Sequence, residues 1–108
     1  MTNNPILLNP EHYKFRLFSN KQVGKYALSI QASYMHYCKP RLTLSDINDY
    51  EEYEIDIFLN EEHINPKYDK NFSEYSWNKY WGDNRYDCGA FVPKKDLGNI
   101  IKSLKHHS

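Results

Sequence analysis

Hydrophobic and polar residues alternate along three stretches of the chain, and this period of two is the pattern of a half-buried β-strand. The stretches are residues 13–18, 26–33 and 53–59. One face of each strand would be apolar and the other polar, which is typical of an antiparallel sheet with one covered face. In the third stretch the polar positions include Glu54 and Asp56.

Turn-forming residues separate these stretches. Residues 19–25 contain Asn20 and Gly24, which suit a hairpin loop between the first two strands. A shorter apolar run at 88–92 follows the turn sequence Gly82-Asp83-Asn84 and predicts a fourth strand.

A C-terminal helix is expected to open at Pro93. Its apolar residues recur at the spacing of one helical face, at Leu97, Ile100, Ile101 and Leu104. Proline is tolerated in the first turn, whereas Gly98 costs about 1 kcal/mol relative to alanine. The sequence thus predicts an α+β fold, in which an antiparallel sheet of about four strands carries the C-terminal helix on one face, in two layers.

The segment 60–87 has no clear period. Asn65-Pro66 excludes a continuous strand, and residues 72–81 are dense in aromatic side chains. Trp77, Tyr80 and Trp81 recur at helical spacing, so we expect a short helix that ends at Gly82. These rings form either core under a long connection or a contact surface.

Composition fits one domain, residues 1–108, and adds an unusual share of aromatic side chains. Phe, Trp and Tyr make up 16% of the chain, with 10 Tyr. Tyrosine tolerates a half-wet position, so some of these rings could supply contact area. Two cysteines are too few for a disulfide framework, and no apolar run approaches the ~20 residues of a membrane span. We expect a cytoplasmic protein with reduced thiols, no signal peptide and no membrane contact.

The formal net charge of zero conceals a segregation of charges along the chain. Residues 1–44 are basic, and so is the segment from Pro93 onward. Residues 45–62 contain no base but eight acids: Asp46, Asp49, Glu51, Glu52, Glu54, Asp56, Glu61 and Glu62. The zero net charge argues against direct binding of nucleic acid, whereas the segregation predicts a polar interaction face.

The acidic tract is the best candidate for that face. A row of carboxylates can imitate the phosphates of nucleic acid or steer the protein onto a basic surface. The simpler interpretation is a solvated strand face that prevents edge-to-edge pairing. The residues that we expect to contact a partner are Asp49, Tyr50, Glu51, Glu52, Tyr53, Glu54, Asp56, Trp77 and Trp81.

Two alternative sites involve cysteine. Lys39 and Arg41 would favour a thiolate at Cys38, and His36 could act as its base, although no third, orienting group is evident. The simpler interpretation of Cys38 is a small buried side chain at a strand end. A zinc site from His36, Cys38, His63 and Cys88 lacks the closely spaced ligand pairs of structural zinc. Because no catalytic motif occurs, we expect neither enzyme activity nor a metal or cofactor.

Several segments together resemble a group of short, uncharacterised proteins of tailed phages and prophages. They are Lys25–Ser33, His36-Tyr37-Cys38, Pro40-Arg41, Tyr53-Glu54-Ile55 and Gly89-Ala90-Phe91-Val92-Pro93. The proteins of this group resemble the chain in two strands, one with the motif SxQAS..HYCxPR and one that is acidic and hydrophobic. This chain departs from its Tyr-Gly-Tyr-Val-Pro turn, where Gly89-Ala90-Phe91 stands instead, and in its more aromatic 60–87 segment.

The resemblance implies a phage or mobile-element origin, and small phage proteins without catalytic motifs often bind and block a host protein. We therefore expect an inhibitor of the anti-CRISPR or anti-defence type, acting in the host cytoplasm. Its partner would be a host protein with a basic nucleic-acid-binding surface. The alternatives are a small Cys/His-centred enzyme or zinc-dependent module, and a phage accessory protein that forms a homodimer or larger homo-oligomer.

Overall fold

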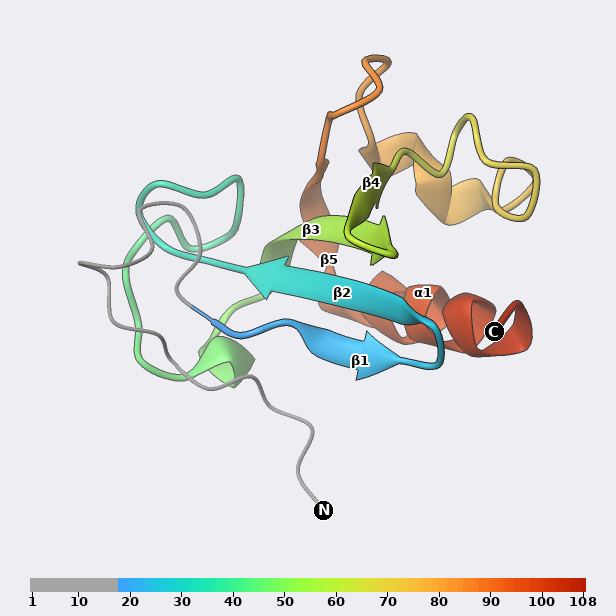
Figure 1. Cartoon of the computed structure of the whole chain (residues 1–108). Helices are drawn as coiled ribbons and strands as arrows, with labels where there is room; N and C mark the ends of the chain where they lie inside the picture. Colours follow the sequence, from blue (N-terminus) through green and yellow to red (C-terminus); the bar gives the residue numbers. More distant parts are fainter. Residues whose placement is uncertain (1–17) are drawn as a thin grey trace.

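A single antiparallel sheet and one long helix organise the chain (Figure 1). The computed structural model describes residues 18–108. The strands are β1 (Lys21–Val23), β2 (Tyr26–Gln31), β3 (Glu52–Leu59), β4 (Glu62–Ile64) and β5 (Gly89–Pro93). The helices are the 3-10 helices η1 (Ile47–Asp49) and η2 (Ser76–Tyr80) and the α-helix α1 (Lys94–His106).

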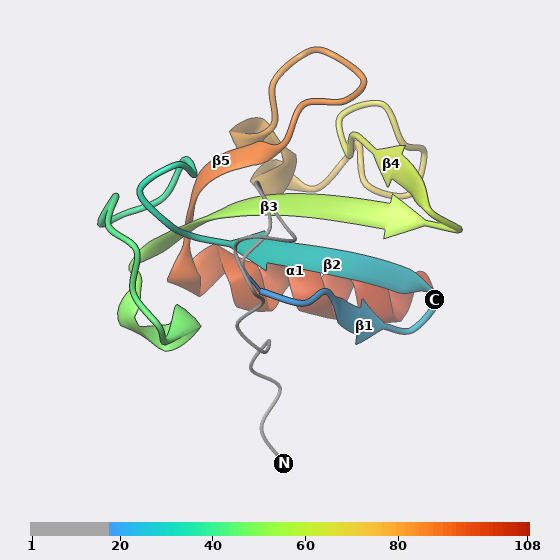
Figure 2. The same cartoon turned by 60° about the vertical axis from the view of Figure 1, so that its left-hand side comes forward.

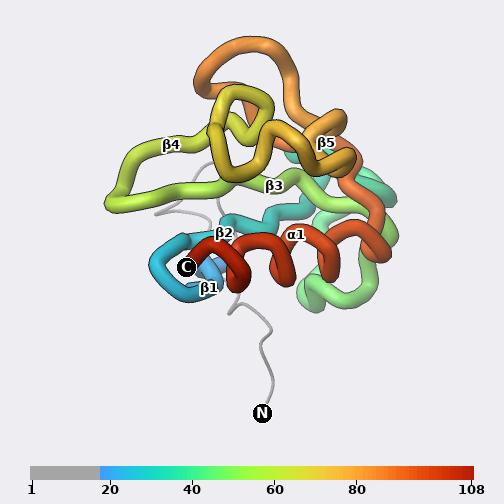
Figure 3. The backbone as a smooth tube through the Cα atoms, turned by 90° about the vertical axis from the view of Figure 1, so that its right-hand side faces the viewer, coloured from blue at the N-terminus to red at the C-terminus, as the bar shows by residue number. Residues whose placement is uncertain are grey.

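Strand β3 is the centre of the sheet. It pairs along one edge with β2, which in turn pairs with β1. Its other edge is shared by β4, opposite the end of β3, and β5, opposite its start. Figure 3 shows α1 passing in front of β1 and β2, while the segment between β4 and β5 lies above β3, on the side away from β2.

The register of β2 and β3 builds the core. Leu28 lies opposite Ile57 and Ile30 opposite Ile55, so apolar side chains of both strands share one face. Helix α1 runs along one face of the sheet, behind β2 in Figure 2. Its residues Ile100 and Leu104 are fully buried in the same core cluster. This arrangement confirms the α+β class, the C-terminal helix and the half-buried strand at 53–59. The strand predicted at 26–33 is present as β2 but ends at Gln31, and its polar residues Ser29 and Gln31 are buried as well.

Two short strands were not predicted. Strand β1 lies within the predicted loop 19–25, and the hairpin turn contracts to Gly24-Lys25, where Gly24 has a φ of 59°. The predicted strand 13–18 lies outside the described residues except for its last residue, Phe18, which is buried. Strand β4 forms because Asn60 and Glu61 both have positive φ, as a two-residue turn of type I′ requires.

The short helix expected in 72–81 is the 3-10 helix η2, and the expected fourth strand is β5. Pro93 is the N-cap of α1, so the helix begins one residue later than expected, at Lys94. Within residues 18–108 no helix is long and apolar enough to cross a membrane.

Candidate interaction surface

The acidic tract is divided between the two ends of β3. Asp46, Asp49 and Glu51 are exposed before the strand, whereas Glu61 is exposed in the turn after it and Glu62 at the start of β4. The eight residues of β3 span about 26 Å, so the two groups are far apart. The tract does not form one continuous acidic face.

Glu54 and Asp56 project from the face opposite the core, as the alternation predicted, but both are half-buried. The Tyr37 N–H donates to Glu54 Oε1 at 3.1 Å, and His63 Nε2 lies 2.6 Å from Asp56 Oδ1. Burial raises the pKa of Glu54, and the Asp56 charge acts in the same direction. The predicted row is therefore present at these two positions, but it is neither fully solvated nor free of partners within the chain.

Four aromatic residues expected to contact a partner lie in the core instead. The exposed fraction is 1% for Tyr50, 2% for Tyr53, 4% for Trp77 and 2% for Trp81. The Tyr50 hydroxyl donates to the Leu42 carbonyl and accepts from the Leu44 N–H, both at 2.7 Å. The sequence could not separate core rings from surface rings, because aromatic residues serve both purposes.

Large apolar side chains are nevertheless exposed at another place, which the sequence analysis did not single out. Four come from the loop between β2 and η1, and the fifth comes from β5. We call these five residues the aromatic patch: Tyr34, Met35, Tyr37, Leu42 and Phe91. The rings of Tyr37 and Phe91 lie side by side, and the other three residues share the loop that carries Tyr37. Exposed apolar residues that lie together mark interaction sites more often than residues scattered singly.

The backbone of β5 is shaped to present Phe91. This residue has a φ of 51°, a left-handed conformation that costs a bulky residue roughly 1–3 kcal/mol. The pairing of β3 with β5 shifts register here, between Tyr53 and Ile55. The Phe91 N–H donates to the Tyr37 carbonyl at 3.0 Å, and the two ring centroids are 5.8 Å apart. The fold thus maintains a strained residue to hold an exposed ring beside a second one.

Buried polar groups hold the loop that carries the patch. Ser33 Oγ lies 2.6 Å from His36 Nδ1 and accepts from the Met35 N–H at 3.0 Å. The Cys38 thiol donates to the Ser33 carbonyl at 3.1 Å. His36 and Cys38 are both buried, so this motif supports the loop from within.

The catalytic interpretation of Cys38 does not fit this environment. Burial raises the pKa of the Cys38 thiol and outweighs the opposing effect of Arg41. The Arg41 charge thus favours the thiolate as expected, but burial has the larger effect, and the buried-residue interpretation fits. Burial and the nearby Glu54 and Asp56 also raise the pKa of Cys88, to about 12.

The suggested zinc ligands are not brought together. In the part of the chain that the structure describes, no three His, Cys, Asp or Glu side chains are placed to hold a metal ion. His63 instead lies beside Asp56, with its ring edge-on to Phe58.

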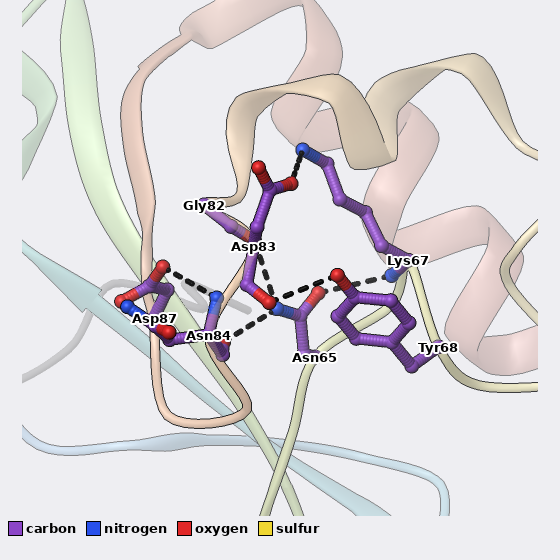
Figure 4. Close-up of polar contacts among 7 residues, drawn as sticks. All are labelled: Asn65, Lys67, Tyr68, Gly82, Asp83, Asn84 and Asp87. Carbon is purple, nitrogen blue, oxygen red and sulfur yellow. Dashed lines mark hydrogen bonds and ion pairs between the residues drawn. The ribbon is translucent and has the colours of Figure 1, made fainter.

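A second region with exposed tyrosines comprises the 82–87 loop and the adjacent Tyr68. Figure 4 shows the polar contacts that hold Tyr68 and this loop together. The buried Asn65 amide donates to the carbonyls of Gly82 and Asn84, at 2.9 and 2.8 Å. The Tyr68 hydroxyl donates to the Asp83 carbonyl at 2.9 Å. Tyr68 and Tyr86 are 67% and 71% exposed, so this region offers a comparison for the patch.

Comparisons with protein-family models, with curated proteins and with solved structures each gave no match to this chain. The resemblance to phage proteins therefore stays a prediction, and the functional argument depends on the geometry of the surface.

Proposed function

We propose that this protein is a binding protein that docks onto a partner protein through the aromatic patch. The observation that carries this proposal is the exposure of Tyr34 and Tyr37, at 64% and 48%, on one loop, with the Tyr37 ring beside the strained Phe91. Tyrosine is enriched among the residues that dominate interface energies. Because the fold holds the loop by buried hydrogen bonds, little ordering would oppose binding.

The loop that carries the patch and the start of β3 lie at the same end of the sheet (Figure 1). The Lys39 N–H donates to the Glu52 carbonyl at 3.1 Å, and the Glu51 N–H donates to the Lys39 carbonyl at 2.7 Å. These bonds fix the patch loop against the start of β3, where Asp49 and Glu51 are exposed. The Glu51 carboxylate lies 3.7 Å from the Lys39 ammonium of the same loop, whereas no ion pair among residues 18–108 involves Asp49. Such a rim favours a partner with a basic surface, since opposite charges speed encounter and fix orientation.

The fuller form of the proposal adds the expectation drawn from the resemblance. The chain would be a phage-encoded inhibitor, similar in role to anti-CRISPR proteins, that acts in the host cytoplasm. It would cover a basic nucleic-acid-binding surface of a host protein. The patch provides the contact area for this role, and the rim carboxylates of Asp49 and Glu51 provide its charge.

An affinity capture with paired variants tests the patch. The protein and its Y34S/Y37S variant are used as bait in host lysate, and captured proteins are quantified by mass spectrometry. The matched control is Y68S/Y86S, which removes two tyrosines elsewhere that are at least as exposed. We expect the partner to be retained by the protein and by the control, and to fall about tenfold or more with Y34S/Y37S.

A partner captured equally by Y34S/Y37S and by the unchanged protein would contradict the proposal. The solution mass of the bait, measured by light scattering, shows whether the patch instead joins two copies of this chain. If the protein forms a dimer that Y34S/Y37S abolishes, the patch binds a second copy of this chain, and the proposal of a different partner protein is wrong.

A further inference from the structure

A groove of about 670 Å³ lies between η2 and α1, away from the aromatic patch. Its apolar wall is formed by Tyr75 and Trp77, and Ser103 of α1 also lines it. Lys102, Lys105 and His106 line the side formed by α1. The volume falls within the range of about 300–1,000 Å³ that is usual for small-molecule sites.

The aromatic wall is rigidly held. The rings of Tyr75 and Trp77 stack with centroids 5.9 Å apart and an angle of 25° between their planes. Trp77 Nε1 donates to Ser103 Oγ at 3.1 Å, and the Ser103 hydroxyl donates to the Asn99 carbonyl at 2.8 Å. These bonds tie η2 to α1, so the groove needs little rearrangement to accept a ligand.

The charge of the groove is positive. The Asp96 carboxylate in its lining is already bound to the Tyr80 hydroxyl and the Asn99 side-chain amide. Among residues 18–108, no ion pair involves Lys102 or Lys105. Burial lowers the pKa of Lys21 in β1, and the positive charge of the nearby Lys105 lowers it further. Two clustered lysines without a carboxylate partner favour an anion.

We propose that this groove binds a small aromatic acid. The ring of the ligand would lie against Tyr75 and Trp77, and its phosphate or carboxylate would lie against Lys102 and Lys105. An apolar wall beside two lysine ammonium groups is typical of sites that recognise one end of a ligand by shape and the other by charge. The inference is independent of the docking proposal, because the two surfaces share no residue.

A titration followed by NMR of the backbone amides tests this site. The probe is phenyl phosphate, with inorganic phosphate and phenol as probes that carry only the charge or only the ring. We expect phenyl phosphate to shift the amides of Ser76, Trp77, Asn99 and Ser103, and to bind more tightly than either partial probe. K102Q/K105Q should weaken its binding about tenfold, because a charge-assisted hydrogen bond contributes about that much.

The matched control is K25Q/K70Q, which removes the same charge from exposed positions outside the groove and should bind like the unchanged protein. Three results would overturn the proposal. One is the absence of shifts at the groove with phenyl phosphate, and another is equal binding by K102Q/K105Q. The third is equal affinity for inorganic phosphate or phenol, because the ring or the charge would then contribute nothing.

Discussion

The two cysteines lie in environments that disfavour a thiolate. Cys38 is 1% exposed and its thiol donates to a backbone carbonyl, while Cys88 is half-buried near two carboxylates. Burial raises the pKa of both thiols, in the case of Cys88 to about 12. Since the thiolate is the nucleophile, both residues should be chemically inert in the folded protein.

Alkylation measures this directly. Near pH 8 a free cysteine, with a pKa of about 8.5, is partly ionised and reacts readily. We expect iodoacetamide to modify Cys38 and Cys88 of the folded protein far more slowly than in concentrated urea, as followed by mass spectrometry. Rapid modification of Cys38 in the folded state would contradict its burial and reopen the nucleophile hypothesis.

At the scale of elements, two glycines differ in what limits substitution, which is helix propensity at Gly98 and side-chain packing at Gly89. Gly98 lies on the exposed side of α1, and a Cβ there would meet nothing within 4 Å. Gly89 begins β5, and a Cβ there would lie 2.8 Å from Cζ3 of the buried Trp81. The helix tolerates a poor helix former at Gly98, whereas β5 needs glycine to approach the tryptophan ring.

Alanine substitutions should therefore act in opposite directions. We expect G98A to raise the free energy of unfolding by about 0.5–1 kcal/mol through helix propensity. We expect G89A to lower it by about 1–3 kcal/mol through overpacking against Trp81. Urea denaturation measures both, and each variant serves as the control for the other. A G89A protein as stable as the original would mean that Trp81 is packed less tightly than the structure shows.

At the scale of the whole molecule, the division of the acidic tract determines where charge can help binding. Asp49 and Glu51 lie on the side of the patch loop, whereas Glu61 and Glu62 lie at the other end of β3. Only the first pair can act on a partner that sits on the patch. Its effect should be screened by salt, because both carboxylates are exposed.

Neutralising each pair in turn tests this assignment. Against the partner identified by capture, D49N/E51Q should reduce the association rate several-fold at low salt and much less at high salt. The matched control E61Q/E62Q removes the same charge at the far end and should leave the rate nearly unchanged. Equal effects of the two variants, measured by surface plasmon resonance, would show that only net charge matters.

The main elements could be predicted because their patterns are long and periodic. The alternation over residues 53–59 predicted β3, and the stripe at Leu97, Ile100, Ile101 and Leu104 predicted α1. The three-residue strands β1 and β4 are too short to show a period, so their pairing depends on neighbours supplied by β2 and β3. The proposed patch could not be predicted, because the rings expected to contact a partner, those of Tyr50, Tyr53, Trp77 and Trp81, are buried, and the sequence did not indicate which other rings are exposed.

The sequence by itself determined which residues alternate, which helix face is apolar and which segments carry charge, because these are local properties of the chain. Only the tertiary structure decided whether each aromatic residue lies in the core or on the surface. Tyr50, Tyr53, Trp77 and Trp81 became core, while Tyr34, Tyr37 and Phe91 became surface. Burial depends on contacts between distant segments, such as the bond from Phe91 to Tyr37, and no local pattern contains that information.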